Sequence, residues 1–215
     1  VVQSLVFRHI LKIEIQDYSL FLLGGLLPWV FISSILEMGV PILVNASELL
    51  KSFKLSPTVL VLSQAIDNFV NFIFAFLILL IYTVFTNTVN VEGLIYFPIA
   101  ALVLFIGAAA LTWLLTFLNV FYRDTRFLIS FVMSVMFFLT PIFYPVEYIP
   151  EPFRWTVNIN IFYLLIAPVR ACTHDFELVQ FFQMLSKSFG LSIFLILISR
   201  FYWLRKKGEF YATLV

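Results

Sequence analysis

The sequence is poor in charge. Asp, Glu, Lys and Arg make up only 12% of its 215 residues, whereas 62% of the residues are hydrophobic. An ordinary soluble domain carries about 25% charged residues, because its surface faces water. So few charges leave most of this chain without an aqueous surface to occupy. The composition therefore predicts an integral membrane protein.

Further absences narrow the function. The formal net charge of +1 excludes the clustered Lys and Arg of a nucleic-acid-binding face. The single cysteine, Cys172, cannot form a disulfide within the chain. His9 and His174 have no companion ligands at metal-binding spacing, so no metal is expected. The sequence also has no G-x-x-x-x-G-K-[ST] phosphate loop, which predicts that this chain does not hydrolyse nucleotides itself.

Long uncharged runs are present instead. About 20 apolar residues, each rising 1.5 Å along a helix, match a hydrocarbon core of about 30 Å. On this basis we expect five complete spans, at roughly 18–36, 59–85, within 93–122, 127–146 and 188–204.

The Lys and Arg residues indicate an orientation. They favour the side that carries 45–57, 121–126 and 205–215, and basic residues near span ends concentrate in the cytoplasm. With the C-terminal tail inside, five spans leave Val1 outside. A chain that starts inside needs one more span, so we expect six in total, with the first span preceding Val1 and 1–7 as its outer end.

Two connecting segments differ from the spans. Residues 46–54 favour a short amphipathic helix, with a cap at Asn45 or Ser47 and with Lys51 in the last turn, where it complements the helix dipole. Residues 147–187 are too charged and too rich in proline to cross the bilayer. Within them the uncharged stretch 155–169 has only 15 residues. That length suits a short re-entrant or interfacial helix on the outer side.

The fourth span has unusual boundaries. Arg123, Asp124 and Arg126 crowd three charges into four positions just before it, and Pro141 and Pro145 break it near its end. A tight charge cluster, an apolar run and then two prolines are not typical of a soluble core.

The order of these motifs resembles the ABC-2 class of transporter permeases that export O-antigen, capsule and teichoic-acid polysaccharides. The matching motifs are Gly-Leu-Leu-Pro-Trp at 25–29, Asn-Ala-Ser-Glu-Leu-Leu-Lys at 45–51, Phe-Tyr-Arg-Asp at 121–124, Thr-Pro-Ile-Phe-Tyr-Pro at 140–145 and Ile-Phe-Tyr-Leu-Leu-Ile-Ala-Pro-Val-Arg at 161–170. They come in the family's order along nearly the whole chain. One departure is Asn160-Ile161, where such permeases usually have Asn-Pro.

The resemblance implies an all-α, polytopic transmembrane helix bundle, with 1–215 as one ABC-2 type transmembrane domain. It implies a homodimer in the bacterial inner membrane, which works with two copies of a separate nucleotide-binding subunit. That subunit would hold ATP and Mg and hydrolyse the ATP. This chain would then be a transport subunit and not an enzyme, and it would move a lipid-linked polysaccharide outward.

The resemblance also suggests functional residues. A cytoplasmic coupling helix that docks on the ATPase would use Glu48, Leu49, Lys51, Phe53 and Lys54. Binding or gating of the substrate would use Tyr122, Arg123, Asp124, Arg126, Phe137, Phe138 and Tyr144. The two arginines could hold a polyprenyl diphosphate by bidentate hydrogen bonds, which lysine reproduces poorly.

Simpler interpretations remain open for each group. The segment 46–54 could be a connector lying on the bilayer surface. The arginines could serve only to orient the chain, Arg123 and Asp124 could form a structural ion pair, and the aromatic residues could face lipid. Asp67, inside the second span, is either a functional intramembrane carboxylate or an interfacial group.

Two alternative functions also remain open. One is an ABC-2 exporter of drugs or small lipids. The other is a membrane-embedded transferase acting on polyprenyl-linked sugars, in which Asp67, Asp124 or Glu37 would have to catalyse alone, because the sequence offers no Ser/His/Asp or Cys/His arrangement on one side of the membrane.

Overall fold

The computed structural model describes residues 17–53, 56–86, 90–174 and 176–214, without the side chains of Leu49, Lys51, Phe53 and 211–214. These residues form helices and no strand, which confirms the expected all-α class. The helices are α2 (Tyr18–Gly39), α3 (Ile42–Asn45), α4 (Ser47–Phe53), α5 (Pro57–Thr86), α6 (Val91–Phe121), α7 (Thr125–Leu139), the 3₁₀ turns η1 (Val146–Tyr148) and η2 (Glu151–Phe153), α8 (Trp155–Ile159), α9 (Ile161–Ala171) and α10 (Leu178–Leu214). The predicted outer end of a preceding span, at 1–7, lies outside the described residues.

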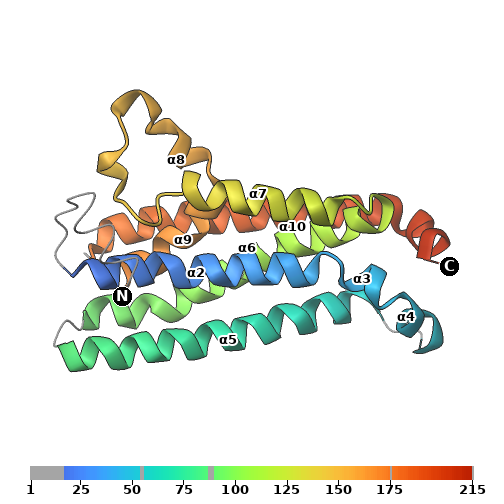
Figure 1. Ribbon diagram of the computed structural model, residues 1–215, viewed down its shortest axis with the longest axis horizontal. Helices are drawn as coiled ribbons and strands as arrows, with labels where there is room; N and C mark the ends of the chain where they lie inside the picture. Colours follow the sequence, from blue (N-terminus) through green and yellow to red (C-terminus); the bar gives the residue numbers. More distant parts are fainter. Residues whose placement is uncertain (1–16, 54–55, 87–89, 175, 215) are drawn as a thin grey trace.

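The long helices run side by side along the molecule (Figure 1). Within the described residues, four helical segments are long and apolar enough to cross a membrane: Tyr18–Asn45, Pro57–Phe85, Val91–Phe121 and Leu178–Phe210. This confirms a polytopic membrane protein. Two serines of α10 form hydrogen bonds to the backbone of α6. Ser192 Oγ donates to Val103 O at 3.3 Å, and Ser199 Oγ donates to Ala110 O at 2.9 Å. Such small polar residues let membrane helices approach closely.

The connections gather at two ends of the bundle. At one end, called here the α4 end, lie α3, α4, the turn from α6 to α7 and the end of α10 (Figure 1). At the opposite end, the α8 end, lie the start of α2, the end of α5, the start of α6, and α8. The sequence groups the connections in the same way. That the α4 end faces the cytoplasm stays a prediction from the Lys and Arg bias.

The fourth expected span is not a full-length helix. Helix α7 has 15 residues and ends at Leu139, not at Val146, so it measures only about 22 Å. It stops because Thr140 is extended, with φ −83° and ψ 130°, and Pro141 cannot continue the helix. The extended chain then reaches the start of α2, where the Tyr18 hydroxyl donates to Phe143 O at 3.0 Å.

The last expected span begins earlier than predicted. Helix α10 starts at Leu178, ten residues before the expected Ser188, so the outer segment ends near residue 177 and not at 187. Its first turns bury Phe181 and Leu185 on one side and expose Lys187 on the other. A charged residue such as Lys187 on the exposed side does not interrupt α10, because this part of the helix can project beyond the bilayer. Lys187 Nζ instead donates to Asn158 Oδ1 of α8 at 3.4 Å.

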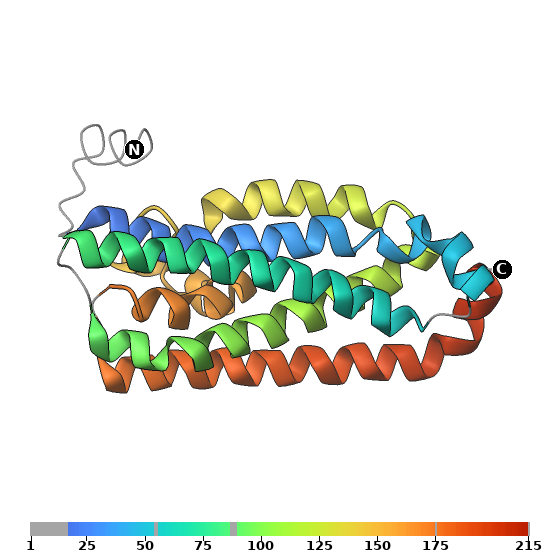
Figure 2. The ribbon, with the colours of Figure 1, turned by 90° about the horizontal axis from the view of Figure 1, so that it is seen from below.

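The outer segment forms two short helices, as expected. Helix α8 has five residues and is mostly exposed, whereas the eleven residues of α9 lie between α2, α6 and α10 (Figure 2). Helix α9 is too short to cross a bilayer, yet Leu165 and Val169 on it are fully buried. The expected re-entrant element is therefore α9, inserted into the α8 end of the bundle.

Candidate functional site

The turn that joins α6 to α7 carries the predicted cluster of charges. Asn119, near the end of α6, is buried, and its Oδ1 accepts a hydrogen bond from Arg126 N at 3.3 Å. Tyr122 O accepts from the Thr125 amide at 2.9 Å and from the Thr125 hydroxyl at 2.6 Å. These bonds close a tight turn at the α4 end. They fix Arg126 in the first turn of α7.

The predicted charged side chains of this turn point into solvent. Tyr122, Arg123, Asp124 and Arg126 are all exposed. Among the described side chains no ion pair joins Asp124 to either arginine, and the Arg126 guanidinium lies 4.5 Å from the centre of the Phe127 ring. The structural ion pair considered for Arg123 and Asp124 is thus absent from the structure. Both guanidinium groups are accessible to a ligand.

A hollow of about 360 Å³ lies beside this turn. The end of α2, with Glu37, and Pro41 just before α3 form one wall, and α7 forms the other, with Arg126 and Ser130. The first-turn amides of α7 all donate within the chain, so the helix contributes only the field of its dipole, which favours an anion here. The hollow places a cation and hydrogen-bond donors where α7 leaves the α4 end.

One face of α7 combines aromatic rings with hydroxyls. Phe127, Phe131 and Phe138 are 62%, 67% and 71% exposed, and Ser130 and Ser134 between them are exposed as well. Their spacing places all five on one side of the helix. The exposed face of α7 therefore offers both ring surfaces and hydrogen-bonding groups along its length.

The predicted pair Phe137 and Phe138 separates in the structure. Phe138 belongs to the exposed face, whereas Phe137 turns inward, with its ring centre 5.7 Å from that of Trp29 and 5.0 Å from that of Phe143. Tyr144 is partly buried and its hydroxyl donates to Phe138 O at 3.4 Å. Phe137 and Tyr144 thus pack within the chain at the end of α7, whereas Phe138 is accessible to a ligand.

Two residues hold the Thr-Pro-Ile-Phe-Tyr-Pro segment, 140–145. They are Asn160, which caps α9, and Arg170 of α9. Asn160 Nδ2 donates to Thr140 Oγ1 at 2.9 Å. Arg170 Nη1 donates to Pro141 O at 2.7 Å, and Arg170 Nη2 donates to Tyr163 Oη at 3.1 Å. These bonds join residues 20 and 29 positions apart in the sequence, so the two motifs form one structural unit at the α8 end.

Sequence reasoning missed Asn119, Asn160 and Arg170 as organising residues. Asn160 also caps α9, because its Oδ1 accepts from the amides of Phe162 and Tyr163 at 3.0 and 3.1 Å. Ile161 is then the first residue of α9, a position that proline also favours, because no helical hydrogen bond is lost there. This accounts for the departure from the Asn-Pro pattern. The signal in the sequence was an Asn, residue 160, directly before the apolar run 161–169, a pattern that predicts the start of a helix.

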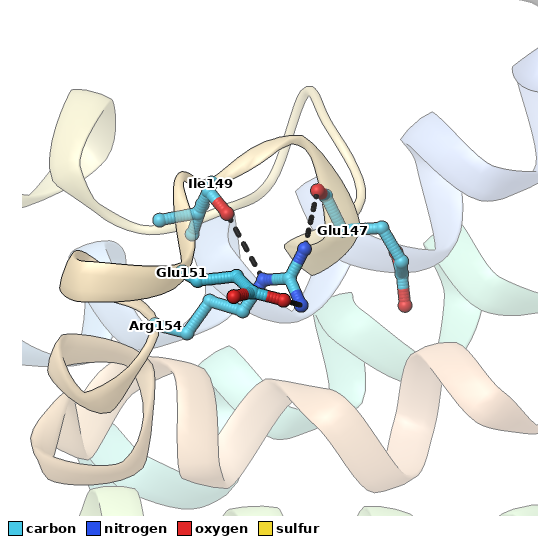
Figure 3. A network of polar contacts seen from close by, with 4 residues as sticks. All are labelled: Glu147, Ile149, Glu151 and Arg154. Atoms are coloured by element: carbon cyan, nitrogen blue, oxygen red, sulfur yellow. Dashed lines mark hydrogen bonds and ion pairs between the residues drawn. The ribbon is translucent and has the colours of Figure 1, made fainter.

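The exposed loop 147–154 is organised by one arginine. Arg154 Nε donates to Ile149 O and Arg154 Nη2 donates to Glu147 O, both at 3.0 Å, and Arg154 Nη1 lies 3.8 Å from Glu151 Oε1 (Figure 3). The network closes the two 3₁₀ turns on themselves. It fixes the backbone of the loop at Glu147 and Ile149.

The predicted coupling helix is present as α4. It spans Ser47–Phe53, close to the expected 46–54, and Glu48 in its first turn is exposed. The preceding α3 anchors it, because Leu43 is fully buried in a cluster with Phe117 and Phe210. Lys54 and the side chains of Leu49, Lys51 and Phe53 lie outside the described part, so their contacts stay a prediction.

The sequence offered three carboxylates, any one of which a transferase would have to use alone. Asp67 is exposed on α5, ten residues after the helix begins and so about 15 Å along it. Glu37 lines the hollow at the α4 end, and Asp124 precedes α7. Asp67 is therefore not a buried carboxylate within this chain.

A family comparison is consistent with this architecture. Residues 1–173 match the family model described as ABC-2 type transporter. The match covers every element up to the end of α9.

Similar curated proteins include three named O-antigen export system permease protein RfbA. The one from Myxococcus xanthus is 27% identical over 150 residues, which cover 70% of this chain and 58% of that protein. Two from Klebsiella pneumoniae are 24% and 26% identical over 156 residues, 72% of this chain and 60% of each of them. The matched part thus spans less than two thirds of these relatives.

Proposed function

The chain belongs to the ABC-2 type transporter family, and from that premise we propose that it is the transmembrane subunit of an ATP-driven exporter of a lipid-linked polysaccharide. It acts as a homodimer in the bacterial inner membrane, with two copies of a separate ATPase that binds ATP and Mg. Its relatives named as O-antigen export permeases support this class of substrate.

The observation that carries the proposal is the exposed face of α7. Ser130 and Ser134 lie among three exposed phenylalanines on this side. Ser134 Oγ donates to Ser130 O at 2.9 Å, and both serine oxygens keep lone pairs that can accept from a ligand. Sugars present apolar ring faces and hydroxyl edges, so a surface of phenyl rings and hydroxyls suits them in both respects. We place the glycan pathway along this face, between two copies of the chain.

The two ends of the pathway then have distinct tasks. At the α4 end, taken as cytoplasmic, Arg123 and Arg126 hold the diphosphate of the lipid carrier by charge-assisted hydrogen bonds. At the α8 end, α9 and the extended segment 140–145 narrow the exit. Closure of the ATPase reaches the bundle through α4 and the buried anchor Leu43 of α3.

We expect charge reversal on α4 to uncouple the transporter. In the double variant Glu48→Lys/Lys51→Glu, the ATPase should co-purify at least fivefold less and polymer export should fall in proportion, because the complementary charges of the partner then meet like charges. The measurement is the amount of ATPase retained on the purified chain, together with surface polymer.

A swap of the exposed pair Lys206 and Glu209 provides the matched control. These residues lie at the same end, on α10, with Lys206 Nζ 2.6 Å from Glu209 Oε2. Lys206→Glu/Glu209→Lys keeps both charges and should leave ATPase binding unchanged. Normal binding and export in the α4 variant would reduce α4 to a surface connector.

We expect lysine to fail at the arginine positions although it keeps the charge. Arg123→Lys and Arg126→Lys should each lower polymer-stimulated ATPase activity several-fold, because lysine cannot form the two parallel bonds of a guanidinium with a diphosphate. Insertion and orientation should be normal. Arg205→Lys, an exposed arginine stacked 4.3 Å over the Phe201 ring at the same end, is the control. Parental activity in both lysine variants would mean that the arginines only orient the chain.

A further inference from the structure

A second cavity, of about 540 Å³, opens at the α8 end. The start of α2, helix α9, the start of α10 and the loop 145–148 surround it. Its volume lies within the range of about 300–1,000 Å³ that is typical of small-molecule sites. None of the residues expected from the sequence to act on substrate lines it.

The wall of this cavity contains a buried cation. Arg170 is only 8% exposed, and its guanidinium carbon lies 4.8 Å from the Phe21 ring centre and 5.3 Å from that of Tyr163. It donates to two neutral oxygens, Pro141 O and Tyr163 Oη, although a guanidinium has five N–H groups. Among the described residues it has no carboxylate partner. Donors therefore remain for a ligand.

The rim of the cavity supplies acceptors and an aromatic ring. Glu147 and Glu177 are exposed, and the Glu177 carboxylate accepts a hydrogen bond from the Gln180 amide. Tyr148, on the same rim, is 55% exposed. Arg154 holds the backbone of Glu147 in place, because its Nη2 donates to Glu147 O (Figure 3). The rim thus faces the cavity with carboxylates and one accessible ring.

This mixture selects among ligand classes. An anion would be attracted by Arg170 but repelled by Glu147 and Glu177, whereas a cation would be repelled by Arg170 and attracted by the two carboxylates. His174 also lines the wall and adds an imidazole to these groups. A neutral polyol can both donate to the carboxylates and accept from the guanidinium, and the apolar face of a sugar ring can stack on Tyr148. The cavity is therefore best suited to carbohydrate without net charge.

We propose that this outer cavity is a carbohydrate-binding subsite that holds one or two sugar units of the glycan after they leave the bilayer. The inference rests on the proposed export function, because that function brings a glycan to this end. Tyr148 stacks on the sugar ring, Glu147 and Glu177 accept from its hydroxyls, and Arg170 donates to them. Holding the emerging chain here opposes its return.

Photo-crosslinking from the rim tests the proposal. The residue p-benzoylphenylalanine replaces Tyr148, or Phe153 as a control, since Phe153 is 60% exposed in the same loop but does not line the cavity. One arm irradiates polymer-producing cells and detects adducts with antiserum against the polymer. The other irradiates the purified transporter with a free oligosaccharide fragment of that polymer. We expect at least fivefold more adduct at 148 than at 153 in both arms, and at least a threefold loss on adding Glu177→Gln.

The outcomes separate the subsite from the export function. Equal or absent labelling at 148 and 153 with the purified fragment overturns the subsite, even where cells export polymer normally. Competition by inorganic phosphate but not by unlabelled fragment would assign the cavity to an anion and overturn it too. Absence of polymer export in parental cells would refute the proposed function, whereas the fragment arm would still decide the subsite, because it requires no transport.

Discussion

Gly93→Ala should lower the stability of the protein by about 3 kcal/mol, although it adds a single methyl group. Gly93 lies in the first turn of α6, where its amide donates to Asn90 Oδ1 at 3.0 Å. A Cβ at this position would overlap the carbonyl oxygen of Cys172 and lie 2.9 Å from its carbonyl carbon. These are backbone atoms of a fully buried residue, so no side-chain rotation can relieve the overlap. The start of α6 would have to move away from the end of α9.

Gly190→Ala is the matched control and should have the opposite sign. A Cβ at Gly190 meets nothing within 4 Å, and the residue lies inside the long helix α10. Alanine there should raise stability slightly, by up to about 0.5–1 kcal/mol, because it restricts the unfolded backbone. Apparent melting temperature in detergent, followed by the fraction that stays monodisperse after heating, measures both variants. Similar values for the two variants would mean that contact with Cys172 does not constrain Gly93.

Arg170→Met should destabilise the protein by about 3 kcal/mol, which is the second large effect that we expect. The change removes the donors to Pro141 O and Tyr163 Oη and leaves these acceptors without their partner. Each hydrogen bond from a charged group contributes about 1.5–3 kcal/mol, and relief of the buried charge offsets part of the loss. The extended segment 140–145 should then detach from α9.

Arg154→Met is the control for Arg170→Met, because the two arginines differ mainly in burial. Arg154 makes two backbone hydrogen bonds and one ion pair, but its side chain is 44% exposed. Water can replace its contacts, so its loss should cost less than about 1 kcal/mol. Arg170→Lys should fall between parent and Met, since one ammonium cannot reach both acceptors. Equal thermal stability of Arg170→Met and Arg154→Met would show that Arg170 does not hold the extended segment 140–145.

The sequence predicted those elements that depend on the solvent preferences of single segments. The runs at 18–36, 59–85 and 93–122 have no charge, or only Asp67, and they became α2, α5 and α6 with nearly the expected limits. Helix α4 was predictable for a similar reason, because its charges lie within a few positions of one another. Its cap was predicted wrongly: Asn45 ends α3 and Ser47 is already in α4, so Ala46 O accepts the first helical hydrogen bond, from Leu50 N at 3.0 Å. Local chemistry was sufficient in these places.

Predictions were wrong where a boundary depends on a neighbour. The start of α10 was placed too late because Lys187 suggested a loop, whereas Asn158 of α8 provides its partner. The end of α7 was placed too late because absence of charge does not show where a helix stops. Leu139 is the last helical residue since the following chain is extended and bonded to Asn160 and Arg170.

The candidate site divides in the same way. Arg123, Asp124 and Arg126 form a cluster that is contiguous in sequence, so a sequence alone determines that they lie together near a bilayer surface. Only the tertiary structure turned Phe138 outward and Phe137 inward, because packing against Trp29 selects one face of α7. Only the tertiary structure also placed Arg170 against the Phe21 ring and Pro141 O of the extended segment 140–145. Burial and hydrogen-bond partners at long separation are properties of the folded chain, and no local pattern encodes them.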